Sequence, residues 1–204
     1  MEAQLKEAGV QVRLGVSATP EIVKEIGAEV VFMDAGGKPV LPPISGIEKA
    51  VTAEDVLSGK AKVTGKNVVI VGGGVTGLET AEYLAPDYQV TALEMLDKVG
   101  GNLYPSVVMH LAQEIMKNGG TIAKGKRLES VGEREVVAED VKTGEKTAIP
   151  ADTIILAMGV RANRPELEAF KEAFPGKVIL IGDSDHPGQI YDALHSGHDR
   201  AFVY

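Results

Sequence analysis

Cysteine and tryptophan are both absent from the 204 residues. Without a thiol the chain has no disulfide, no cysteine nucleophile, no redox-active cysteine pair and no cysteine ligand for an iron–sulfur cluster. Aromatic residues make up only 4% of the sequence, so we expect an aliphatic core. His195 and His198 are spaced i, i+3, as two metal ligands on a helix can be, but the pair is more typical of a solvated helix face. We predict neither a metal site nor a catalytic triad.

Basic charge and long apolar runs are also scarce. The 29 acidic residues outnumber the 21 basic ones, which gives a formal net charge of −8. This charge disfavours nucleic acid and anionic membrane surfaces as partners. No apolar run approaches the ~20 residues of a membrane-spanning helix. Residues 1–7 lack the pattern of a signal peptide, so we expect a cytoplasmic protein.

Glycine, by contrast, is abundant, and one glycine-rich segment is the most informative motif. Residues 67–71 are rich in β-branched side chains and run into a segment with the spacing Gly-x-Gly-x-x-Gly. Its residues, all candidate cofactor contacts, are Gly72, Gly73, Gly74, Val75, Thr76 and Gly77. Gly72 allows a tight turn, Gly74 lets a pyrophosphate approach the backbone, and Gly77 lets the following helix pack against the sheet. Val75 and Thr76 are expected to donate backbone N–H groups to that pyrophosphate.

An acidic residue follows this motif at the distance expected for ribose binding. A second strand, residues 89–93, ends at Glu94, which lies 94 − 72 = 22 residues after Gly72. Dinucleotide-binding folds place the acid roughly 20 residues on. A carboxylate accepts hydrogen bonds from the ribose hydroxyls of NAD and repels the 2′-phosphate of NADP. The alternative for Glu94 is an ordinary solvated loop acid.

The neighbours of Glu94 point to the same cofactor. We expect Met95 to pack on the adenine. Lys98 is the only nearby cation in the sequence, and no arginine stands ready for a 2′-phosphate. We therefore predict NAD(H) in preference to NADP(H).

The wider pattern predicts an α/β protein with a three-layer, Rossmann-like fold. Apolar runs indicate buried parallel strands, and amphipathic segments indicate the helices that cover them. The segments 127–131, 134–141 and 146–149 are typical of a small antiparallel meander. Further strands are expected at residues 10–14, 30–33, 121–123, 153–157 and 178–181, and helices at 2–8, 20–27, 51–57, 105–117 and 189–203.

Segments along nearly the whole chain resemble one known group. They are residues 31–39, 52–59, 77–84, 151–159, 181–183 and 190–197. In this order they are similar to the C-terminal half of the Old Yellow Enzyme-like NADH:flavin oxidoreductases, the group of 2,4-dienoyl-CoA reductase and 2-enoate reductase. That group lies within the pyridine nucleotide-disulfide oxidoreductase superfamily. The Ala-Glu-Asp-Val-Leu-Ser-Gly segment at residues 53–59 favours it over the related disulfide reductases.

The resemblance implies two domains and two cofactors. Residues 52–157 would form an NAD(H)-binding domain, and residues 1–51 and 158–204 would form part of an FAD-binding domain. The FAD contacts that it implies are Gly36, Gly182 and Asp183. Near the nicotinamide it implies Ala157, Met158, Gly159 and Glu79. The alternative for Glu79 is a solvated acid in the first helical turn.

The sequence also departs from this group. Asp34-Ala35 stands where the group usually has Ala-Thr, Ala162 where it has proline, and Ser184 where it often has cysteine. The glycine motif of the FAD domain, the flavin-bearing barrel and the cluster cysteines are not in the sequence. We therefore expect an excised fragment or a split subunit, whose partners are the missing N-terminal flavin barrel and the rest of the FAD domain.

Two functions remain open at this point. In the first, the chain positions NADH for hydride transfer to FAD in a complete enoate or dienoyl-CoA reductase-like enzyme. No side chain is a compelling acid, base or nucleophile, so the isolated chain is expected to bind NAD(H) with little or no turnover. In the second, it is a non-catalytic dinucleotide-binding module that has lost the flavin site.

Overall fold

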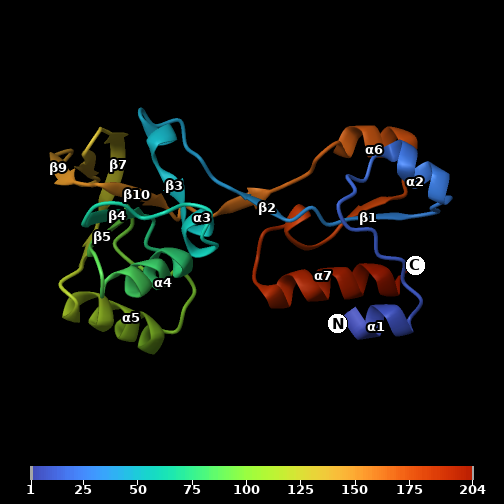
Figure 1. Cartoon of the computed structure of the whole chain (residues 1–204), viewed down its shortest axis with the longest axis horizontal. Helices are drawn as coiled ribbons and strands as arrows, with labels where there is room; N and C mark the ends of the chain where they lie inside the picture. Colours follow the sequence, from blue (N-terminus) through green and yellow to red (C-terminus); the bar gives the residue numbers. More distant parts are fainter. Residues whose placement is uncertain (1, 204) are drawn as a thin grey trace. The chain divides into compact units, whose positions relative to one another are not determined.

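The computed structural model describes residues 2–203, which divide into two compact units (Figure 1). The central unit comprises residues 38–161, and the flanking unit comprises the residues before and after it. The chain passes between the units in β2 (Gly37–Pro39) and β11 (Val160–Ala162), which pair with each other. The expected NAD(H)-binding segment, residues 52–157, falls within the central unit.

A parallel sheet of five strands forms the middle of the central unit. Its order is β3 (Val51–Thr52), β10 (Thr153–Leu156), β4 (Asn67–Val71), β5 (Gln89–Glu94) and β6 (Thr121–Lys124). Val71 of β4 pairs with Leu93 of β5 and with Leu156 of β10. The carboxyl ends of the three inner strands are therefore level, and the residues that follow them meet at one edge of the sheet.

Helices cover one face of this sheet, as Figure 1 shows. They are α3 (Ala53–Leu57), α4 (Val75–Leu84) and α5 (Pro105–Lys117). Val68 and Ile70 of β4 point to this face and pack with Leu78 of α4 and Ile115 of α5, all fully buried. Alternate side chains of a strand point to opposite faces of the sheet. The β-branched run of β4 therefore places apolar side chains on both faces.

A small antiparallel sheet covers the other face. Its strands, in order, are β7 (Lys126–Val131), β8 (Glu135–Asp140) and β9 (Lys146–Pro150). Val69 and Val71 of β4 pack here with Leu128 and Val136. Helices, parallel sheet and meander make three layers, so the fold class predicted from the sequence is confirmed.

The flanking unit is built around a two-stranded parallel sheet, β1 (Val31–Met33) with β12 (Val178–Leu180). Its helices are α1 (Glu2–Glu7), α2 (Pro20–Ile26), α6 (Leu167–Ala173) and α7 (Ile190–Phe202). Short 3-10 turns lie at η1 (Ile47–Lys49) in the central unit and η2 (Gly182–Ser184) here. Met33, Phe170 and Phe174 form the small core.

Side-chain caps explain where two helices begin, and two of the expected elements are wrong. Thr19 and Thr52 cap α2 and α3, with their hydroxyls accepting hydrogen bonds from the N–H groups of Ile22 (3.4 Å) and Asp55 (3.1 Å). Residues 10–14 form no strand, since this alternating segment has no pairing partner within the described residues. The expected helix at 51–57 begins as strand β3, because residues 51–52 pair with β10.

One carboxylate fastens the sheet at the amino ends of two strands. Asp152, just before β10, accepts hydrogen bonds from the backbone N–H groups of Lys66 and Asn67, both at 3.0 Å. It also pairs with Arg134 at 3.0 Å. These contacts, the two backbone N–H groups first, hold the pKa of Asp152 well below its ordinary value. Asp152 thereby links the start of β4, the strand that leads to the glycine motif, to the start of β10.

Candidate cofactor-binding site

A cleft of about 860 Å³ opens in the central unit where the parallel strands end. Its volume lies within the range of small-molecule and cofactor sites. Open α/β sheets bind ligands at this edge. Seven residues singled out from the sequence line it: Gly72, Gly74, Glu94, Met95, Ala157, Met158 and Gly159. They come from three different strand ends, which the level register of β4, β5 and β10 brings together.

The three motif glycines play different structural parts. Gly72 has a φ of +110°, and a Cβ there would overlap the carbonyl oxygen of Ala157. A Cβ at Gly77 would overlap the carbonyl oxygen of Gly72. Gly74, in contrast, has a φ of −71° and no heavy atom within 4 Å of the position that a Cβ would take. Gly72 and Gly77 are needed by the fold, whereas Gly74 leaves open space at the cleft.

Gly74 is also the N-cap residue of α4, directly before Val75. No side chain caps this helix end, and its first turn contains no acidic residue. The first N–H groups of a helix lack intrahelical partners and carry the positive end of the helix dipole. Val75 and Thr76 lie in this first turn beside the cleft without lining it. The turn can therefore donate hydrogen bonds to an anion that enters the cleft.

Glu94 is held directly over the glycine turn. One carboxylate oxygen accepts a hydrogen bond from the N–H of Gly73 at 2.7 Å, and the other from the N–H of Leu96 at 2.8 Å. The side chain is half-buried in the cleft wall. Each carboxylate oxygen has about two acceptor sites, so both can still accept a hydroxyl of a ligand. This geometry is not that of a freely solvated loop acid.

Glu79 does not reach the cleft. It is exposed on α4, beyond the first turn in which we expected it, and is not among the lining residues. Gly73 in the turn and Gly77 in α4 are buried and likewise do not line the cleft. A nicotinamide contact for Glu79 stays a prediction.

The opposite wall of the cleft comes from residues that sequence reasoning missed. They are Pro42, Pro43, Ile44 and Ser45 before η1, and Lys126, Arg127, Leu128 and Glu129 of β7. Lys98 is the only cation near Glu94 in the sequence, but it does not line the cleft. The cations that line the cleft are Lys126 and Arg127, so this expectation is wrong for the folded chain. The alternation of polar and apolar residues predicted the strands of the meander, but it did not predict which residues of β7 would line the cleft.

The residues implied as FAD contacts lie in the flanking unit. Gly36 and Asp183 line a cavity of about 270 Å³ together with Asp34, and Gly182 is buried close to the carboxylate of Asp34. Asp183 accepts a hydrogen bond from the N–H of Gly188 at 3.1 Å. This cavity holds two carboxylates and is much smaller than the cleft of the central unit.

Ser184, which stands where the resembling group often has cysteine, has a structural role. It is fully buried, and its hydroxyl accepts a hydrogen bond from the N–H of Ala35 at 2.6 Å. The same hydroxyl donates to the carbonyl of Asn163 at 2.9 Å. It therefore ties together the segments that follow β1, β11 and β12.

Comparison with known proteins identifies the family of this chain. The family described as pyridine nucleotide-disulphide oxidoreductase matches residues 19–183. The chain belongs to this family. Domains of the family bind FAD and NAD(P)H. The resemblance drawn from the sequence is thereby confirmed.

Three similar proteins are each considerably longer than this chain. An NADH oxidase from Thermoanaerobacter brockii is 36% identical over 208 residues, which cover 99% of this chain and 32% of that protein. A cinnamate reductase from Clostridium sporogenes is 31% identical over 204 residues, covering 98% of this chain and 30% of that protein. A solved structure of 2-naphthoyl-CoA reductase with 2-naphthoyl-CoA matches at a TM-score of 0.84 and 27% identity, covering 97% of this chain and 30% of that one. The chain thus spans about a third of the length of these relatives.

Within residues 2–203, none of the helices combines the length and the apolar content that crossing a membrane requires.

Proposed function

We propose that this chain is the nucleotide-binding part of an NADH-dependent flavin oxidoreductase of the enoate or dienoyl-CoA reductase type. One observation carries the proposal: residues from three strand ends, chosen from the sequence for contacts to NADH, line a single cleft of suitable volume. Residues 52–157 form the NAD(H)-binding domain, and the flanks belong to an FAD-binding domain. The cinnamate and 2-naphthoyl-CoA reductases among the relatives favour this type of enzyme.

The residues of the cleft divide the work of binding NADH. The open space at Gly74 and the N–H groups that begin α4 receive the pyrophosphate. Glu94 accepts hydrogen bonds from the adenosine ribose, and Met95, half exposed, packs on the adenine. The segment 157–159 lines the nicotinamide end.

The group that accepts the hydride from NADH would bind outside this cleft. FAD, when bound, supplies the flavin ring that takes the hydride. Gly36 and Asp183 line the flanking cavity and would form one wall of the FAD site, with Gly182 buried next to Asp183, but this cavity of about 270 Å³ is too small to enclose FAD. The rest of that site, and the substrate site, would come from the flavin barrel and the remainder of the FAD domain, as partners or as part of a longer chain.

A second function has its own supporting observation. The carboxylates of Asp34 and Asp183 line the same flanking cavity, and Asp34 lies against Gly182. Two negative charges there oppose the approach of an anionic flavin nucleotide. On this basis the chain would be a dinucleotide-binding module without a flavin site.

Calorimetric titration tests the proposed function. NADH should bind the purified chain at one site, and the same preparation should oxidise NADH no faster than buffer does, because it holds no hydride acceptor. Adding FAD and the barrel and FAD-domain portion of a relative should restore oxidation. NADH binding without any such restoration would favour the binding module, and folded protein that binds no NADH would rule out both functions.

A further inference from the structure

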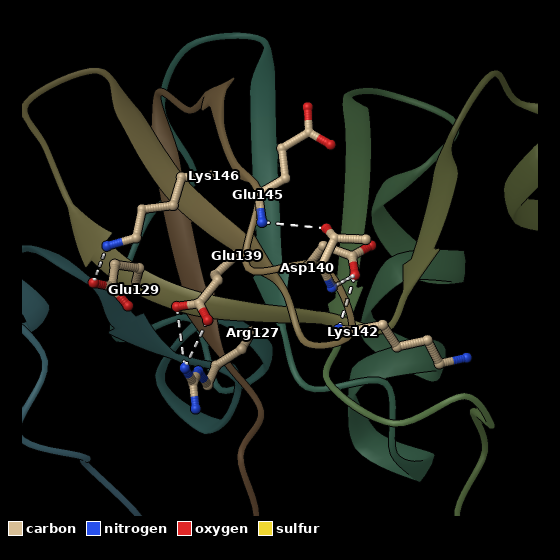
Figure 2. Close-up of polar contacts among 8 residues, drawn as sticks. Arg127, Glu129, Glu139, Asp140, Lys142, Glu145 and Lys146 are labelled. Carbon is tan, nitrogen blue, oxygen red and sulfur yellow. Dashed lines mark hydrogen bonds and ion pairs between the residues drawn. The ribbon is translucent and has the colours of Figure 1, made fainter.

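The charged residues of β7 that line the cleft are all engaged by partners on β8 and β9, the other two strands of the meander. Figure 2 shows Arg127 facing Glu139 of β8, and Glu129 facing Lys146 of β9. One terminal nitrogen of Arg127 lies 3.0 Å from each carboxylate oxygen of Glu139. Lys146 reaches Glu129 at 2.7 Å. These pairs cancel the charge of β7 locally.

Lys126, the remaining cation of this wall, is engaged in the same way. Its ammonium lies 3.1 Å from a carboxylate oxygen of Asp140 on β8, and both side chains are about a quarter exposed, at 27% and 26%. The other oxygen of Asp140 accepts hydrogen bonds from the N–H groups of Lys142 (2.9 Å) and Thr143 (3.0 Å). These two N–H groups, followed by Lys126, lower the pKa of Asp140 to about 2. Asp140 is therefore ionised at neutral pH.

This wall starts beside the loop that follows Glu94. The N–H of Gly125, next to Lys126, donates to the carbonyl of Leu96 at 3.1 Å. Lys142 pairs with Asp97 in the same loop at 2.9 Å. Glu94 itself takes part in no ion pair among residues 2–203. Among the charged residues that line the cleft, Glu94 at the proposed ribose site is thus the one whose charge is not balanced by an ion pair.

We propose that Glu139 and Asp140, neither of which lines the cleft, determine its preference for NADH over NADPH. By pairing with Arg127 and Lys126, they withhold the cations that a 2′-phosphate needs beside Glu94. Recruiting either cation would break its ion pair and leave a second carboxylate near the phosphate. The inference rests on the proposed function, because it presumes that the ribose binds at Glu94.

Two variants that each remove one negative charge test this, with a matched control. Glu139→Gln and Asp140→Asn remove the ion pairs while keeping side-chain size, and an asparagine oxygen at 140 can still accept the N–H groups of Lys142 and Thr143. Glu133→Gln is the control: it removes one negative charge and releases Lys49, and neither residue lines the cleft. The dissociation constants of NADH and NADPH are measured by calorimetry for each protein, and folding is checked by thermal unfolding.

Removing one negative charge about 6 Å from a phosphate strengthens its binding roughly 3-fold at a water-like dielectric of ~80 and roughly 10-fold at about half that value. We therefore expect Glu139→Gln and Asp140→Asn to tighten NADPH binding by this factor and to change NADH binding less than about 2-fold, with the control unchanged. Adding Lys126→Met to Asp140→Asn should reverse the gain. An unaltered NADPH-to-NADH affinity ratio in folded variants that still bind NADH would overturn this inference alone. A wild-type chain that binds neither nucleotide would overturn the proposed function as well.

Discussion

Replacing Gly74 by alanine should weaken NADH binding about 100-fold and leave the fold intact. No protein atom lies within 4 Å of the position of the new methyl group, and the φ of −71° suits alanine. The methyl group would instead occupy the space proposed for the pyrophosphate and separate it from the N–H groups of α4. Losing two charge-assisted hydrogen bonds costs roughly 3 kcal/mol, which corresponds to the stated factor. Calorimetric titration with NADH measures it.

Gly77 provides the contrast that separates binding from folding. A methyl group at Gly77 would overlap the carbonyl oxygen of Gly72, so Gly77→Ala should lower the thermal unfolding temperature. For Gly74→Ala the free energy of unfolding should change by no more than about 1 kcal/mol, the cost of a weaker helix cap. Normal NADH affinity in a folded Gly74→Ala variant would refute the assignment of the pyrophosphate to this turn.

The second large effect is expected at Glu94. The Glu94 carboxylate accepts hydrogen bonds from the N–H groups of Gly73 and Leu96. A glutamine has only one side-chain oxygen and can accept only one of these two hydrogen bonds. It also offers the ribose no charged acceptor. We expect Glu94→Gln to weaken NADH binding about 10-fold and to weaken NADPH binding less, because repulsion of the 2′-phosphate is removed.

Both nucleotides should be titrated against Glu94→Gln, with Glu133→Gln as the charge-matched control outside the cleft. An NADH dissociation constant equal to that of the wild-type chain would show that Glu94 serves only to brace the turn. A parallel loss of NADH and NADPH would show that it does not read the ribose.

Local patterns were sufficient to predict one side of the cleft. The strand, glycine turn and helix at residues 67–84 form a local motif: Gly72 and Gly77 answer steric needs of the turn, and Gly74 leaves open space at the cleft. Glu94 was predictable for the same reason: a second parallel strand returns to the same edge of the sheet. Residues 157–159 followed from the third apolar strand and from the family resemblance together.

The other side of the cleft was not predictable from local pattern. Lys126 and Arg127 reach it only because the antiparallel meander packs on the parallel sheet through Leu128 and Val136. Alternation along β7 shows two faces but does not say which one meets a ligand. Residues 10–14 failed for a related reason, because alternation predicts a strand only where a partner strand exists.

Backbone amide hydrogen exchange with and without saturating NADH tests the central claim most directly. Binding in the cleft should slow exchange at residues 72–78 and 94–96, where the turn, the start of α4 and the Glu94 loop meet. Exchange around residues 34–36 and 182–193 should stay unchanged. If NADH saturates the protein but leaves exchange at 72–78 and 94–96 unaltered, the cleft is not its binding site.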